Sequence, residues 1–221
     1  RFENHGSNWF VAGGLYGDSM KSGSSNGDEG WGAAGRFIYA PVVNSSQVLH
    51  LGVRGAYRSI DTSSPVMKIK DQTTDFSNFN IVNTGVLPEF ESATLFGPEI
   101  GASWGPLYLT AEHTTADIDR SGRQSLEFSG WNAAISLNLT GESRTNSYRI
   151  DAGEFKAIRP NQYFDLSNGE FGAWEISARY ASVDLNDGDI MGGEEDALSI
   201  GLNWYLNRNV RIMADWTRIL D

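Results

Sequence analysis

Apolar and polar residues alternate with a period of two along most of the chain. In the clearest run, from Trp131 to Leu139, every second residue is apolar and the residues between are small or polar. Such alternation places the apolar side chains on one face of a β-strand, and no window shows the 3.6-residue period of an amphipathic helix. The pattern predicts about nine strands, at 8–17, 31–40, 47–59, 93–104, 107–116, 131–139, 171–183, 198–206 and 210–217.

The connections between these strands fall into two kinds. Short ones are expected at 41–46, 105–106, 140–147 and 207–208, and longer polar ones at 18–30, 117–126 and 184–196. Short turns at one end and long loops at the other are typical of an outer-membrane β-barrel. The less regular stretches 61–91 and 141–170 must then each contain either no membrane-crossing strand or two, because neighbouring strands have to stay antiparallel.

The tryptophans favour a membrane barrel over a soluble β-sandwich or jelly roll, which would bury most of them in one core. All seven lie on the apolar face of their predicted strands. Indole rings prefer the headgroup level of a membrane, so a barrel carries an aromatic belt at each rim. The expected belts are Trp9, Trp104, Trp174 and Trp204 at the short-turn end and Trp31, Trp131 and Trp216 at the long-loop end.

The opposite face of the predicted strands is polar, as expected of a wall that borders water. Its basic residues are candidates for lining a pore and guiding anions, and Glu99, Glu112, Glu175 and Asp215 add negative charge. Histidine titrates near neutrality, so His50 is alternatively a pH-sensing group. The anion-guiding candidates on this face are Arg36, His50, Arg54 and Arg58, joined by Lys68 and Lys70 in the irregular segment.

Composition and charge exclude several classes of protein. The 221 residues contain no cysteine, which removes disulfide scaffolds and thiolate chemistry. The net charge of -11 argues against nucleic acid as a partner. The absence of an 18-residue apolar run excludes a membrane-spanning helix but not a membrane-spanning barrel.

Much of the negative charge is concentrated between residues 184 and 196. Six acidic residues lie there without a basic one, which favours a solvated loop outside the pore. Binding of a divalent cation by Asp184, Asp187 and Asp189 is an alternative, because such cations prefer oxygen ligands. No cofactor is expected.

Two short motifs of enzymes occur without the structural context that they need. Gly30, Gly32 and Gly35 match a dinucleotide-binding fingerprint, but a strand rather than a helix is predicted to follow them. Residues 101–105 match a nucleophile elbow, and there too a strand follows. We therefore expect no enzyme activity.

Several sequence segments resemble those of the phosphate-selective porins O and P of the Gram-negative outer membrane. They are GAAGRFIYAP at 32–41, VLHLGVRGAYR at 48–58, NTG at 83–85, LTGESR at 139–144, GAWEISARYASVDL at 172–185 and GLNWYLNRNV at 201–210. The resemblance implies an antiparallel 16-stranded transmembrane β-barrel that forms homotrimers, in which inward-folded loops and basic side chains guide anions. Lipid and lipopolysaccharide would contact its outer face, and the resemblance adds Arg144, Lys156 and Arg159 to the anion-guiding candidates.

The chain departs from this family pattern in length and in lysine content. At roughly 14 residues per crossing, 16 strands would consume the whole chain, so residues 1–221 are expected to be a barrel segment that lacks N-terminal strands and the last strand. There are only four lysines, at 21, 68, 70 and 156. Arginine also binds phosphate but is not equivalent to lysine, which leaves phosphate selectivity open.

The expected function is that of an outer-membrane porin. Its water-filled channel would let small hydrophilic solutes diffuse passively, above all anions such as phosphate or polyphosphate. A non-transporting structural or adhesive barrel in the outer membrane is the alternative.

Overall fold

The structure is a computed structural model that describes residues 1–17, 30–60, 67–72 and 80–220, and nearly all of its ordered elements are β-strands. Among these residues, no helix has the length and apolar content to cross a membrane.

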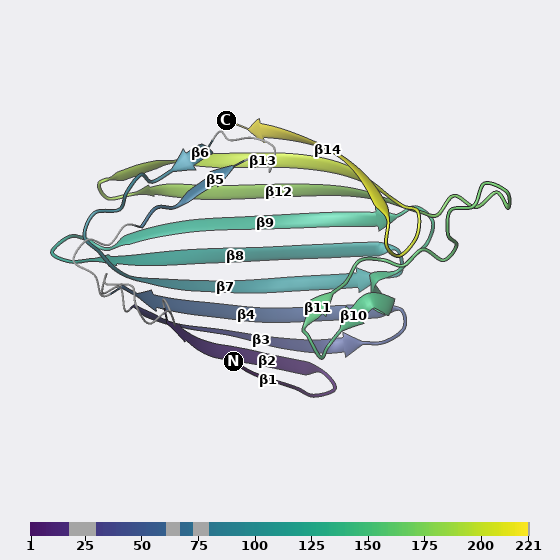
Figure 1. Ribbon diagram of the computed structural model, residues 1–221, viewed down its shortest axis with the longest axis horizontal. Helices are drawn as coiled ribbons and strands as arrows, with labels where there is room; N and C mark the ends of the chain where they lie inside the picture. The colour runs from purple at the N-terminus through teal and green to yellow at the C-terminus, as the bar shows by residue number, and fades with distance from the viewer. Residues whose placement is uncertain (18–29, 61–66, 73–79, 221) are drawn as a thin grey trace, which may run out of the picture.

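Ten strands form one antiparallel sheet, in the order β1-β2-β3-β4-β7-β8-β9-β12-β13-β14 (Figure 1). Its edges, β1 and β14, are not paired with each other in the described part of the chain. The strands are β1 (Phe2–His5), β2 (Trp9–Gly17), β3 (Trp31–Val43), β4 (Gln47–Ser59), β7 (Phe90–Trp104), β8 (Leu107–Arg120), β9 (Leu126–Asn138), β12 (Ala173–Asp187), β13 (Ile190–Tyr205) and β14 (Arg211–Leu220).

The nine predicted strands are confirmed, and the fold class with them. Strand β1 was not predicted, because four residues are too short to show an alternation. The stretches 61–91 and 141–170 add no strand to the large sheet, so β4 lies beside β7 and β9 beside β12, as antiparallel pairing requires.

Three of the predicted connections are wrong. Strands β8 and β9 extend to a turn at 121–125, and β12 and β13 extend to a turn at Gly188 and Asp189, so 117–126 and 184–196 are largely strand. Their polar residues occupy both faces of the strand ends, which hides the alternation. The expected short connection at 140–147 is instead part of a long one that joins β9 to β12. The predicted loop 18–30 lies outside the described residues except for Gly30.

Two connections fold back over the same face of the sheet. The first holds β5 (Lys70–Gln72) and β6 (Asn80–Asn83), and the second holds a 3-10 helix η1 (Arg144–Ser147), β10 (Tyr148–Arg149) and β11 (Glu154–Phe155). In Figure 1, β5 and β6 lie beside β12 and β13, whereas β10 and β11 lie near β4 at the opposite end of the strands. We call this side of the sheet the covered face and the other side the bare face.

Apolar contacts fix the first inward-folded segment to the covered face. Val82 and Leu87 are fully buried in a cluster with residues of five strands of the sheet. Those partners include Ile118 on β8 and Phe128 on β9. Burial of Leu-sized side chains stabilises such contacts by roughly 2 kcal/mol each, so this segment is held against the sheet.

All seven tryptophans lie on the bare face, as predicted from the alternation. Residues that are direct partners in an antiparallel sheet share a face, and Trp174 is the partner of Trp204 while Trp131 faces His113 and Ser182. Trp131 and Trp216 lie farther from the strand ends than expected, because β9 begins at Leu126 and β14 extends to Leu220. Their role in a membrane interface stays a prediction.

A charge-paired wall as the candidate pore lining

Five predicted wall residues meet at the middle of the covered face. Arg36 on β3 is the direct partner of Arg54 on β4, and Glu99 on β7 is the direct partner of Glu112 on β8. His50 lies on β4 at an even spacing from Arg54, so the two side chains point to the same face of the sheet. The side-chain period of two therefore gathers residues from four adjacent strands into one cluster.

Glu99 is the centre of this cluster. It accepts hydrogen bonds from Arg36 Nε at 3.2 Å and from His50 Nε2 at 2.9 Å, and Arg54 Nη1 lies 3.5 Å away. Gly52 is its direct partner on β4, and a Cβ atom there would lie 2.5 Å from the Glu99 Cγ. A glycine at position 52 therefore makes the space in which the carboxylate lies.

Arg54 links the two carboxylates. Its Nη1 also donates to Glu112, and its Nη2 donates to the Thr114 hydroxyl at 2.9 Å. The side chain of Glu99 is only 11% exposed, whereas those of Arg36 and Arg54 are 34% and 37% exposed. The buried carboxylate thus lies beneath two guanidinium groups that face the solvent.

The second inward-folded segment covers this cluster. The Tyr148 hydroxyl lies 3.0 Å from His50 Nδ1. The Glu99 carboxylate can only accept a hydrogen bond, so we assign a hydrogen to His50 Nε2, which donates to Glu99. The Tyr148 hydroxyl contacts the other ring nitrogen and holds the imidazole against the segment.

A second ion pair fixes the same segment to the wall. Arg144 Nη2 donates to Glu175 at 2.6 Å, and the Tyr205 hydroxyl donates to the other oxygen of Glu175 at 2.7 Å. The Arg144 guanidinium also lies 4.7 Å from the centre of the Tyr108 ring, a cation–π distance. This pair makes Arg144 an anchor of the segment, and its predicted role in guiding anions stays a prediction.

A cavity of about 210 Å³ lies between the second segment and the wall. Arg36, Arg54 and Glu112 line it from the sheet, and Glu154 and Phe155 line it from the segment. The Phe155 ring packs 5.0 Å from the ring of Tyr108, which also faces the cavity. The cavity therefore has a charged wall and an aromatic wall.

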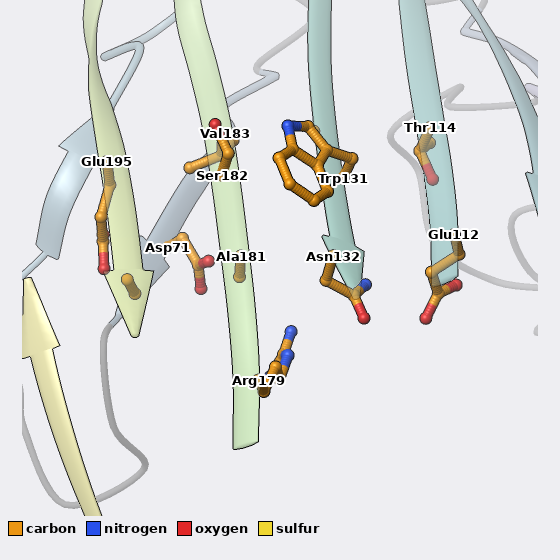
Figure 2. A pocket seen from close by; sticks show the side chains of 12 residues that line it. Asp71, Glu112, Thr114, Trp131, Asn132, Arg179, Ala181, Ser182, Val183 and Glu195 are labelled. Atoms are coloured by element: carbon orange, nitrogen blue, oxygen red, sulfur yellow. The ribbon is translucent and has the colours of Figure 1, made fainter. Parts of the chain in front are cut away.

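A neighbouring cavity of similar volume is shown in Figure 2. Asp71 reaches it from β5, and Arg179 and Glu195 reach it from β12 and β13. Glu112 lines both cavities. The two inward-folded segments thus leave a connected band of charged residues along the covered face.

The remaining candidates are spread over the structure. Arg58 is half-buried on the covered face of β4, and Lys68, Lys70 and Arg159 are exposed on the inward-folded connections. Lys156 Nζ lies 2.6 Å from Glu154. Sequence reasoning missed Tyr108, Tyr148 and Phe155, because the position of the folded-back segment cannot be derived from a strand pattern.

Asp184, Asp187 and Asp189 each have a partner within the protein. Asp189 pairs with Arg120 at 2.6 Å, and Asp187 accepts the Glu127 backbone amide at 2.7 Å. Asp184 accepts the Asn186 amide at 2.8 Å. Among the described residues, no group of three or more carboxylates and imidazoles is placed to hold a metal ion.

Comparison with known proteins assigns the family. The family model described as phosphate-selective porin O and P matches residues 1–218. Porin O of Pseudomonas aeruginosa is 25% identical over 210 residues, which cover 83% of this chain and 46% of that protein. An uncharacterised protein of Caulobacter vibrioides is 32% identical over 206 residues, which cover 89% of this chain and 40% of that protein. The chain thus spans less than half the length of these two relatives. The match over nearly all of its residues shows that the chain belongs to the phosphate-selective porin O and P family, and its location is the outer membrane of Gram-negative bacteria.

Proposed function

We propose that the full-length protein forms a water-filled channel through which small hydrophilic solutes diffuse passively, with anions such as phosphate or polyphosphate preferred. The sheet supports this proposal because its bare face is apolar, as lipid contact requires, and its covered face is polar and charged. The further length of the relatives is enough for the strands that would close the sheet into a barrel. Homotrimer formation and contact with lipopolysaccharide belong to the same proposal.

The main support for the anion preference is that the Glu99 carboxylate is more deeply buried than the two guanidinium groups around it. The carboxylate lies beneath Arg36 and Arg54, so a passing solute meets N–H donors before it meets the negative charge. Guanidinium groups form strong hydrogen bonds with oxyanions even while they hold another partner. A row of such weak contacts lowers the cost of admitting an anion without trapping it.

The same pairing limits the strength of the preference. Arg54 shares its charge with Glu112, which is 38% exposed, so the wall is close to charge-balanced. We therefore expect a modest anion selectivity rather than the strong field of an unpaired cationic pore. Phosphate is favoured over other anions only through the fit between the paired N–H donors of a guanidinium group and the phosphate oxygens.

Reversal potentials of the full-length protein in planar bilayers test the proposal. Under a salt gradient, the sign of the potential should show preferred passage of anions, and Arg36→Gln should reduce that preference while Glu99 keeps Arg54 and His50 as partners. Arg149→Gln is the matched control, because Arg149 is exposed and pairs with Asp151 outside the cavity. A cation-selective potential would contradict the anion preference.

One observation favours the alternative of a non-transporting barrel. Both inward-folded segments lie over the covered face and occupy space that a solute would need. A full-length protein that inserts into bilayers but carries no current would identify the barrel as a structural or adhesive one.

A further inference from the structure

The cavity beneath the second inward-folded segment has features that a pore for simple inorganic anions does not need. Its lining includes the rings of Tyr108 and Phe155 and the carboxylate of Glu154 from the folded-back segment. Phe155 lies over Gly101, where a Cβ atom would come within 2.8 Å of the ring. The absence of a side chain at position 101 is therefore what allows the ring to lie against the wall.

The charges around the cavity are balanced. Two guanidinium groups, of Arg36 and Arg54, oppose the carboxylates of Glu99 and Glu112, and Glu154 lies beside Lys156. A solute in the cavity therefore meets the carboxylates of Glu112 and Glu154 as well as the two guanidinium groups.

The polar atoms on the two sides of the cavity can still bind opposite charges. In the described part of the chain, Arg36 uses Nε and Nη2 on Glu99, which leaves Nη1 for a solute carboxylate. Glu112 and Glu154 are 38% and 39% exposed, so either can accept hydrogen bonds from a solute ammonium group. The rings beside them offer an apolar surface, as ligand pockets commonly do around a few polar groups.

We propose that this cavity is a binding subsite for a zwitterionic α-amino acid with a short apolar side chain. The carboxylate binds Arg36 and Arg54, the ammonium group binds Glu112 or Glu154, and the side chain packs against Phe155 and Tyr108. The cavity, with a volume of about 210 Å³, admits a solute of the size of a small amino acid. The subsite rests on the proposed channel for its access to solute.

Binding of L-leucine to the detergent-solubilised full-length protein tests the subsite. Calorimetry would compare L-leucine with 3-methylbutanoate, 3-methylbutylamine and inorganic phosphate. Each organic analogue lacks one charged group, and loss of a charge-assisted hydrogen bond weakens binding by roughly tenfold or more. Leucine should therefore bind at least about tenfold more tightly than either analogue. Equal binding of one analogue, or tighter binding of phosphate than of leucine, would overturn the proposal.

Variants separate the subsite from general effects on the segment. Glu154→Gln keeps the shape of the side chain and should weaken leucine binding, and Phe155→Ala should weaken it by about fivefold through lost apolar contact. Arg149→Gln lies on the same segment outside the cavity and should leave binding unchanged. If Glu154→Gln and Phe155→Ala both leave leucine binding unchanged, the subsite is not where we place it.

Failure of the subsite can be told from failure of the channel. Bilayer current reports the channel and calorimetry reports the subsite, so current without leucine binding overturns only the subsite. Leucine binding without current supports the subsite and overturns the proposed diffusion. When both are present, leucine should also lower the current over the concentration range in which it binds.

Discussion

The ion pair of Arg144 and Glu175 should decide whether the second inward-folded segment stays against the wall. Arg144 reaches Glu175 from η1 and also donates to the Lys156 carbonyl at 3.1 Å. The side chain of Arg144 is 14% exposed and that of Glu175 is 2% exposed, so water screens the pair little. Arg144→Gln removes one charge and leaves the buried carboxylate with Tyr205 as its main donor.

The cost of this substitution follows from the burial. Removing one partner of a buried ion pair typically costs about 3–5 kcal/mol. The lower end applies here, because the Tyr205 hydroxyl still donates to Glu175. A cost of about 3 kcal/mol raises the population of the detached segment by roughly a hundredfold. Replacing Glu175 by Gln as well should recover most of the loss, since no uncompensated charge is then buried.

Limited proteolysis and single-channel recording of the full-length protein measure the detached population. Arg144→Gln should be cleaved faster between residues 139 and 172 and should show a larger, noisier open current. The control is Arg149→Gln, because an exposed pair such as Arg149 with Asp151 contributes only about 0–1 kcal/mol. The reasoning is refuted if the two variants are cleaved at the same rate, or if the second substitution at Glu175 restores nothing.

Three further substitutions test the packing of the sheet and its rims. Gly97→Ala should lower the thermal unfolding temperature, because its Cβ would lie 2.6 Å from a backbone oxygen of β8, whereas Gly55→Ala meets nothing closer than 3.6 Å and should be tolerated. Leu87→Ala removes a fully buried side chain of the first inward-folded segment and should cost about 2–5 kcal/mol, seen as faster proteolysis of that segment. The hydrogen bond from Arg120 lowers the pKa of Asp189 at the β12–β13 turn, so its stabilisation is present at neutral pH and is lost as the pH falls through that lowered pKa. Asp189→Asn should therefore lower the unfolding temperature at pH about 7 and have little effect at pH about 2; an equal loss at both values would contradict this assignment.

The strands were predictable because one face of each is apolar over most of its length. The run from Trp131 to Leu139 shows why, since every second residue has to meet the same apolar surroundings. The ends of β12 and β13 were not predictable by this criterion. Asp184, Asn186 and Glu194 are polar whichever face they occupy, so strand and loop give the same sequence pattern there.

The face of each wall residue was predictable, but its partners were not. Alternation places Arg54 and Glu99 on polar faces, and both lie on the covered face. Which carboxylate lies beneath which arginine depends on the register between strands, for example on the pairing of Gly52 with Glu99. The contribution of Tyr148 depends on how the long connection after β9 folds back, and no periodic pattern encodes that path.

The acidity of the chain takes a different meaning once the partners are known. Much of the net charge of -11 is concentrated between residues 184 and 196, but Glu99, Glu112 and Glu175 lie on the wall, as the alternation predicted. Each of them holds an arginine, and a held guanidinium loses less conformational freedom when it binds a solute. Lysine could not serve in the same way, because its compact ammonium lacks the planar fork that binds a carboxylate on one edge and leaves donors on another. A wall with few lysines can therefore still present ordered donors to a solute, and the carboxylates are the reason that those donors are ordered.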